Sequence, residues 1–177
     1  GFAARSLMIV AHPDDELLFG INGGLANRDE NWAVLCCTYG GHVKDEPILG
    51  VIRRNEFSVS MAELGVRAWK MLDQEDSLWR HWSTDSLRSH IDSYRAQLEA
   101  VSDDGKMGRI TKIACHGPEG EYGHPNHISV FEAAKHIATH VFSIGKTDCV
   151  VSPAQRKRLN GLYESQDMRR HLKQSCR

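Results

Sequence analysis

Two polar clusters in this sequence have the residue types and the spacing of a metal-dependent hydrolase site. The first is the run at 12–16, His-Pro-Asp-Asp-Glu, and the second ends in His-Pro-Asn-His at 124–127. A catalytic zinc commonly has three nitrogen or oxygen ligands from the protein and one open position. His12, Asp15 and His127 would form such a site. The same ligand types suit ferrous iron or another divalent metal.

The two remaining candidates of these clusters could transfer protons. Asp14 is a candidate general base, because a carboxylate can take a proton from a metal-activated water as that water attacks an amide carbonyl. His124, if protonated, could stabilise the oxyanion or donate a proton to the departing amine. A structural alternative for the acids is that they simply begin a helix, where the dipole favours negative charge. That alternative does not explain a histidine beside two adjacent carboxylates.

The segments around the two clusters alternate between strand and helix patterns. Short apolar runs predict strands at 7–11, 33–39, 68–72, 110–115 and 149–152. Apolar residues at helical spacing predict helices after each cluster and at 51–64, 85–101 and from 154 onward. This alternation predicts an α/β fold: one domain over 1–177, with a doubly wound, mostly parallel, Rossmann-like sheet and helices on both faces.

This topology predicts where the two clusters meet. In an open parallel sheet, ligands bind beyond the carboxyl ends of the strands, where the winding reverses. In the commonest strand order the reversal lies between the first and fourth strands, which directly precede the two clusters. We therefore expect His12 and the aspartates to meet His124 and His127 there, since histidines three apart on a helix can face the same point.

The helix after the first strand contains Gly20, Gly23 and Gly24, which lower its helix propensity. A close approach of this helix to the sheet would explain them.

Composition excludes several classes of partner and location. The 177 residues suit one core, and 22 basic against 23 acidic residues argue against nucleic acid or an acidic membrane as the main partner. No apolar run reaches the ~20 residues of a membrane span, and no signal-peptide core begins the sequence. Five cysteines without Cys-x-x-Cys spacing are expected to be reduced, mostly buried residues. We therefore expect a cytoplasmic protein.

The ordered set of motifs resembles the LmbE-like, or PIG-L-like, de-N-acetylases. Besides the two clusters, the resemblance rests on Arg53-x-x-Glu56, on Ala62-x-Leu64-Gly65-Val66 and on Lys157-x-x-x-Gly161-Leu162-Tyr163-x-Ser165-Gln166. Together these motifs extend over nearly the whole chain, from residue 7 to about 166. Members of this family remove acetyl groups from N-acetylglucosaminyl conjugates with a divalent metal, usually described as zinc.

The resemblance implies a role for each candidate residue. It matches the metal ligands to His12, Asp15 and His127, the general base to Asp14, and the histidine that assists at the tetrahedral intermediate to His124. Arg53 matches a position associated with substrate contact, and Asp73, after the third strand, would likewise touch sugar hydroxyls. For these last two residues an ordinary surface position is an equally good interpretation: Arg53 as a solvated helix residue paired with Glu56, and Asp73 as a loop acid. The loop at 38–42 departs from the family's commonest pattern, and His116 is a candidate for the cleft or for support of the ligands.

The sequence thus predicts a metal-dependent N-deacetylase whose substrate is a small molecule or glycoconjugate with an N-acetylated amino sugar. Two alternatives stay open: a metal-dependent hydrolase of another bond, such as a phosphoester or another amide, and a non-catalytic sugar-binding domain that contains a metal. Two-metal phosphoesterases need more carboxylates, and a binding domain needs no general base. The sequence implies no partner protein and leaves the oligomeric state open.

Overall fold

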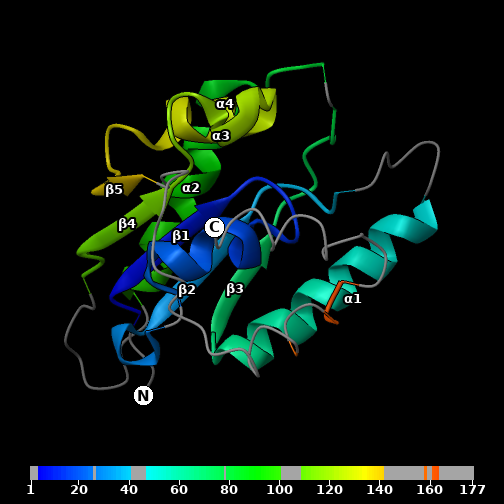
Figure 1. Ribbon diagram of the computed structural model, residues 1–177. Helices are drawn as coiled ribbons and strands as arrows, with labels where there is room; N and C mark the ends of the chain where they lie inside the picture. The colour runs from blue at the N-terminus through cyan, green and yellow to red at the C-terminus, as the bar shows by residue number, and fades with distance from the viewer. Residues whose placement is uncertain are drawn as a thin grey trace.

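The computed structural model describes residues 4–25, 27–40, 47–77, 79–100, 109–141, 158 and 161–163 (Figure 1). Within them, five strands form one parallel sheet in the order β3-β2-β1-β4-β5. The strands are β1 (Ser6–Val10), β2 (Trp32–Cys36), β3 (Ala68–Met71), β4 (Lys112–Cys115) and β5 (His140–Val141). The helices are η1 (Glu16–Leu25), η2 (Arg28–Glu30), α1 (Pro47–Leu64), α2 (Thr84–Ala100), α3 (Gly120–Gly123) and α4 (Pro125–Ala134). This order confirms the doubly wound α/β fold.

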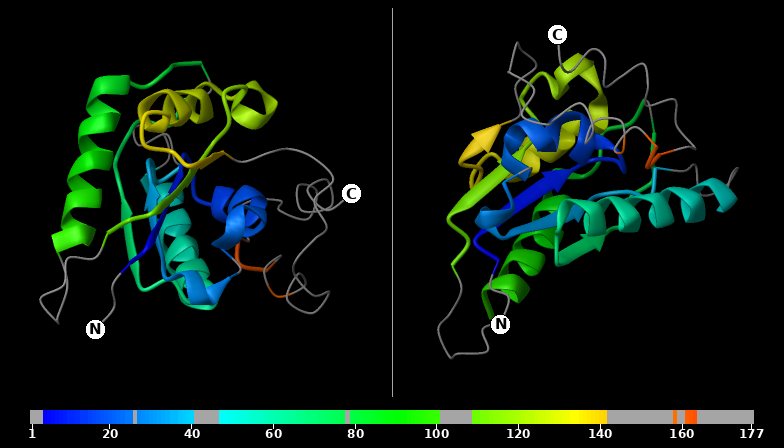
Figure 2. Two further views of the ribbon diagram at one scale, coloured as in Figure 1. Left: turned by 90° about the vertical axis from the view of Figure 1, so that its left-hand side faces the viewer. Right: turned by 60° about the horizontal axis from the view of Figure 1, so that its bottom comes forward.

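The central strands are continuous apolar runs because helices cover both faces of the sheet (Figure 2). Every residue of β1 and β2 is buried. Alternate residues of these strands belong to two separate core clusters, one with α2 and α4 and the other with η1 and α1. The first cluster includes Leu87, Ile91, Val130 and Ala133, and the second includes Leu17, Ile21, Phe57 and Met61. The winding reverses between β1 and β4, as predicted.

The observed elements differ from the predicted ones mainly at their ends. α1 begins at Pro47 rather than at 51, since proline is well suited to the first turn of a helix, where its missing N–H needs no partner. The strand next to β4 is His140–Val141, which is too short to be recognised as an apolar run. The strand predicted at 149–152 lies outside the described residues, as does nearly all of the helix predicted from 154.

Other expectations concern membranes and cysteines. No helix in the described part of the chain has the length and apolar character needed to cross a bilayer. Cys36, Cys37 and Cys115 are buried and free, in agreement with the predicted reduced state. Burial raises the pKa of the Cys115 thiol to about 12. Cys149 and Cys176 lie outside the described residues.

Gly20 marks a close contact between η1 and the sheet, as its position in the sequence predicted. A Cβ at Gly20 would lie 2.5 Å from the Met8 sulfur, and Met8 is fully buried on β1. By contrast, a Cβ at Gly50 of α1 would meet only the Tyr39 Cβ, at 3.7 Å. The two helical glycines therefore differ in the space beside them.

We expect Gly20→Ala to lower the free energy of unfolding by about 1–3 kcal/mol, the usual cost of overpacking a core. Gly50→Ala is the matched control, and it should be neutral or raise the free energy of unfolding by about 0.5–1 kcal/mol, because alanine is the better helix former. Urea unfolding followed by circular dichroism measures both. Equal changes in the two variants would show that the contact with Met8 is not tight.

Candidate metal and catalytic site

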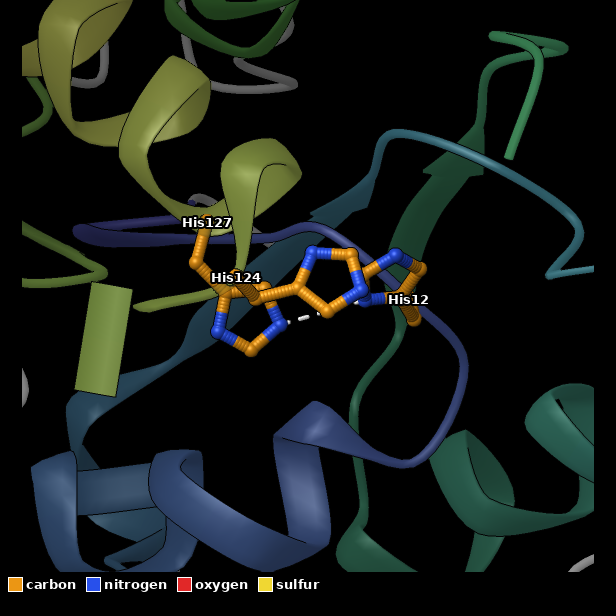
Figure 3. Close-up of side chains that lie close together, drawn as sticks. All are labelled: His12, His124 and His127. Atoms are coloured by element: carbon orange, nitrogen blue, oxygen red, sulfur yellow. Dashed lines mark hydrogen bonds between the residues drawn. The ribbon is translucent and has the colours of Figure 1, made fainter. Parts of the chain in front are cut away.

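The two predicted clusters meet beyond the carboxyl ends of β1 and β4. His12 follows β1, whereas His124 and His127 lie at the start of α4, and the three rings converge in Figure 3. The ring centroid of His12 lies 4.6 Å from that of His124 and 5.1 Å from that of His127. His12 and His127 are buried, and so is Asp15. The reversal of winding therefore brings together residues more than 100 positions apart in the chain.

Three acceptor atoms form a nearly equilateral triangle at this point. His12 Nδ1 lies 3.2 Å from His127 Nε2, and Asp15 Oδ2 lies 3.4 Å from each of these nitrogens. A tetrahedral zinc with bonds of about 2.0–2.1 Å places its ligands about 3.3 Å apart. The spacing of the three predicted ligand atoms therefore fits a metal ion of this kind.

Carboxylates face the outer nitrogen of each histidine in the triangle. His12 Nε2 lies 3.3 Å from Asp76 Oδ1, and His127 Nδ1 lies 2.6 Å from Glu121 Oε2. We assign the proton to each of these outer nitrogens, so that the nitrogens in the triangle carry lone pairs. In the metal-free chain a second proton of His12, on Nδ1, links these atoms. A bound metal cation would take its place, because lone pairs and a carboxylate oxygen repel one another at this distance without a positive charge between them. The donor set is therefore suited to a metal.

Glu121 is the centre of a buried network behind His127. Its Oε2 also lies 2.8 Å from His116 Nδ1, and its Oε1 accepts the N–H of Gly117 at 2.9 Å. Burial alone would raise the pKa of Glu121, but the hydrogen bonds from His116 and His127 outweigh burial and lower this pKa to about 2. His116 Nε2 accepts the N–H of Ala11 at 3.0 Å. His116 thus supports the site from the end of β4, as predicted.

Two overlapping groups of possible metal ligands occur in the described residues, His12 with His124 and His127, and Asp15 with His116 and His127. His116 and His124 each use one ring nitrogen to accept a backbone N–H, which for His124 is that of Asn126 at 3.2 Å. The accepting nitrogen of His124 is Nδ1, so its neutral ring carries the proton on Nε2. This arrangement makes His124 a hydrogen-bond donor toward the cluster.

The pKa values of His124 and His12 are shifted in opposite directions, because burial dominates at His124 and neighbouring carboxylates dominate at His12. Burial lowers the pKa of His124 to about 4, helped by the nearby charges of His12 and His127. His124 is therefore neutral near pH 7, rather than protonated as one reading of the sequence required. Burial would also lower the pKa of His12, but Asp15 and Asp76 outweigh burial and raise it to about 9 in the metal-free chain. A metal bound at His12 would displace that proton.

Asp14 adjoins the cluster in a backbone conformation that residues with a side chain rarely adopt. Its φ is 109°, a strain that typically costs about 1–3 kcal/mol and occurs most often at functional sites. Burial raises the pKa of Asp14, as does the neighbouring Asp15 carboxylate, while Arg53 lowers it. A carboxyl group with a raised pKa is a better proton acceptor near neutral pH than an ordinary aspartate.

Of the two candidate substrate residues, Arg53 lies at the site, whereas Asp73 has an exposed side chain. Arg53 donates to the carbonyl oxygens of Pro13 and Gly40, and its Nη1 lies 3.8 Å from Asp76 Oδ2. The guanidinium therefore bridges the loops that follow β1, β2 and β3. His42, another histidine near this edge in the sequence, lies outside the described residues.

Sequence reasoning missed Asp76, which contacts the cluster from the loop after β3. Besides its contact with His12, Asp76 accepts a hydrogen bond from Asn126 Nδ2 at 3.3 Å. The signal that could have found it is topological. Because the loops at the carboxyl edge of a parallel sheet meet, every acid in the loop after β3 is a candidate for the site, and Asp76 is as good a candidate as Asp73.

Comparisons with known proteins agree with this geometry. Residues 7–138 match the PIG-L family, described as GlcNAc-PI de-N-acetylase. A 1D-myo-inositol 2-acetamido-2-deoxy-alpha-D-glucopyranoside deacetylase of Corynebacterium diphtheriae is 26% identical over 77% of this chain and 53% of its own length. The uncharacterized protein L374 of Acanthamoeba polyphaga mimivirus is 27% identical over 94% of this chain and 73% of its own length. This chain spans about half the length of the curated deacetylases it matches.

A solved structure also has this fold. The N,N'-diacetylchitobiose deacetylase of Pyrococcus horikoshii superimposes with a TM-score of 0.61 and 18% identity, over 97% of this chain and 71% of that one. At this identity the likeness establishes the fold alone. The family match is stronger, because it covers most of the chain and includes both polar clusters. The chain therefore belongs to the PIG-L (GlcNAc-PI de-N-acetylase) family.

Proposed function

We propose that this chain is a metal-dependent hydrolase that removes the acetyl group from an N-acetylated amino sugar, such as an N-acetylglucosaminyl conjugate. The observation that carries the proposal is the triangle of acceptor atoms from His12, Asp15 and His127. The kind of bond and the sugar come from the family and from the deacetylases that the chain resembles.

In this proposal His12, Asp15 and His127 hold zinc or another divalent metal. When bound, such a metal polarises a carbonyl group and brings the pKa of water towards neutrality. Asp76 and Glu121 keep the two histidine rings in the tautomers that offer lone pairs to the ion. Residues that orient ligands in this way commonly change metal affinity by about 10–100-fold when they are replaced.

Asp14 transfers the proton, and His124 stabilises the negative oxygen. The Asp14 carboxylate accepts the proton of the water that attacks the acetamide carbonyl. His124 donates a hydrogen bond from Nε2 to the oxygen that becomes negative, since its lowered pKa keeps it neutral and its Nδ1 accepts a backbone N–H. The C–N bond then breaks, the amine nitrogen takes up the proton that Asp14 received from the water, and acetate and the free amino sugar leave.

The arrangement of acids favours amide hydrolysis over a two-metal phosphoesterase reaction. Asp15 contributes the carboxylate of the triangle, whereas Asp76 and Glu121 face the outer nitrogens of the histidines. Two metal ions need several carboxylates directed at the ions themselves. Among the described residues, one carboxylate and two histidines converge in this way, which suits a single ion.

The proposal is tested by acetate release from N-acetylglucosamine, N,N'-diacetylchitobiose and N-acetylglucosaminyl-inositol, with zinc-loaded and chelator-treated protein side by side. We expect release that depends on the metal. If zinc is bound and none of these substrates yields acetate, the proposed reaction is wrong, and another bond or a binding role takes its place.

We expect His127→Ala to lose bound zinc and acetate release together, because one corner of the triangle is removed. His136→Ala is the matched control, since His136 lies in the turn after α4 with a partly exposed side chain. That variant should keep both properties. Metal content by atomic emission, measured beside the rate, checks the prediction. Full zinc occupancy in His127→Ala would exclude it as a ligand.

We expect Asp14→Asn to keep its zinc and to lower kcat by about two to four powers of ten, the usual contribution of a general base. The amide has nearly the shape of the carboxylate but does not accept the proton. Steady-state kinetics at fixed metal content measure the change. A variant with near-normal kcat would assign proton transfer to another group.

A further inference from the structure

The peptide group that joins Pro13 to Asp14 is held at both of its polar atoms. Its carbonyl oxygen accepts a hydrogen bond from Arg53 Nη2 at 3.1 Å, and its N–H donates to Glu16 Oε2 at 2.9 Å. Holding both atoms fixes the plane of this peptide. The carbonyl oxygen of Asp14 also accepts two backbone N–H groups of η1, so the peptides on both sides of its Cα are held, and with them its φ angle. The unusual φ of Asp14 thus depends on the position of the Glu16 carboxylate.

The Glu16 carboxylate is itself held by two hydroxyl groups in the core. Its Oε1 accepts hydrogen bonds from Ser60 Oγ at 2.7 Å and from Tyr163 Oη at 2.6 Å. All three side chains are fully buried. Two donors on one oxygen fix the rotation of the carboxylate and leave the other oxygen directed at the Asp14 N–H.

Tyr163 belongs to a different part of the chain from the other residues of the site. It lies 147 positions after Glu16 and beyond the 7–138 range of the family match. In the described residues its ring is part of the core cluster beside η1 and α1. A hydroxyl is not required to fill that apolar space, because a phenylalanine ring would fill it equally well. What the hydroxyl adds to the packing of the ring is its hydrogen bond to the buried Glu16 carboxylate.

We infer that Tyr163 and Ser60 are positioning residues for the reaction, because they fix the Glu16 carboxylate and thereby hold Asp14 in the conformation from which it accepts a proton. This inference rests on the proposed role of Asp14 as general base. If Glu16 loses one donor, its carboxylate can rotate, and the peptide before Asp14 can relax towards an ordinary φ. The Asp14 carboxylate is then no longer held in the position from which it accepts the proton of the attacking water.

Tyr163→Phe tests the inference in zinc-loaded protein, since it removes the hydroxyl and keeps the ring. We expect kcat to fall by about ten- to a hundredfold, the usual cost of a small misplacement of a catalytic group, with KM and zinc content unchanged. Ser60→Ala should act in the same direction. Tyr94→Phe is the matched control, because Tyr94 is a buried tyrosine of the opposite core cluster, and its kcat should not change.

A second comparison separates positioning from general damage to the fold. In the Asp14→Asn background, Tyr163→Phe should cause no further loss of kcat, because there is no base left to position. An equal loss in both backgrounds would show that Tyr163 acts on stability alone and would overturn the inference.

The exchange of the Asp14 amide hydrogen, followed by NMR, gives a readout that needs no substrate. We expect faster exchange in Tyr163→Phe and in Ser60→Ala than in the wild type and in Tyr94→Phe, because the hydrogen bond to Glu16 is weakened. Unchanged exchange in both variants would overturn the inference. By contrast, a wild type that releases no acetate but shows this exchange pattern would overturn the proposed function, while the structural link from Tyr163 and Ser60 through Glu16 to Asp14 would stand.

Discussion

The close approach of three potential ligand atoms is the constraint on which the rest of this site depends. Two imidazole nitrogens and a carboxylate oxygen lie 3.2–3.4 Å apart, a spacing that requires a proton or a metal cation between the atoms. Each atom is kept there by a contact behind it, namely Asp76 behind His12 and Glu121 behind His127. Asp15 is held by the N–H of His12 at 2.8 Å. The parallel sheet makes these contacts possible, because it brings the loops after β1, β3 and β4 to one edge.

The backbone strain of the described residues is concentrated at the same edge. Asp14 and Glu121 both have positive φ values, 109° and 59°. Asp14 lies between β1 and η1, and Glu121 lies in the short helix α3 that follows β4, where its dihedral angles are not helical. A third residue of this kind, Asn31, ends the short helix η2 in an ordinary left-handed cap. Residues in unfavourable conformations persist only where neighbours hold them. Here the neighbours are hydrogen bonds from Asp14 to Glu16 and from Gly117 to Glu121.

The sequence was sufficient to predict the sheet, its reversal and the convergence of His12, Asp15, His124 and His127. Buried parallel strands are continuous apolar runs, and the polar clusters directly follow two of them. Asp76, and the role of Glu121 behind His127, could not be predicted in this way. Each has other acids beside it in the sequence, and only the three-dimensional arrangement shows which acid lies against a histidine. The contact of Tyr163 with Glu16 was hidden for the same reason, since no local pattern links residues 147 positions apart.

The long sequence separation within the triangle has a consequence for biosynthesis. His12 and Asp15 leave the ribosome early, but the third corner, His127, follows 115 residues after His12. If the triangle binds a metal as proposed, a nascent chain that ends before α4 offers only two of its three ligands. Binding by all three ligands then favours the completed fold by mass action. The yield of folded protein would in that case depend on the supply of metal at a late stage of synthesis.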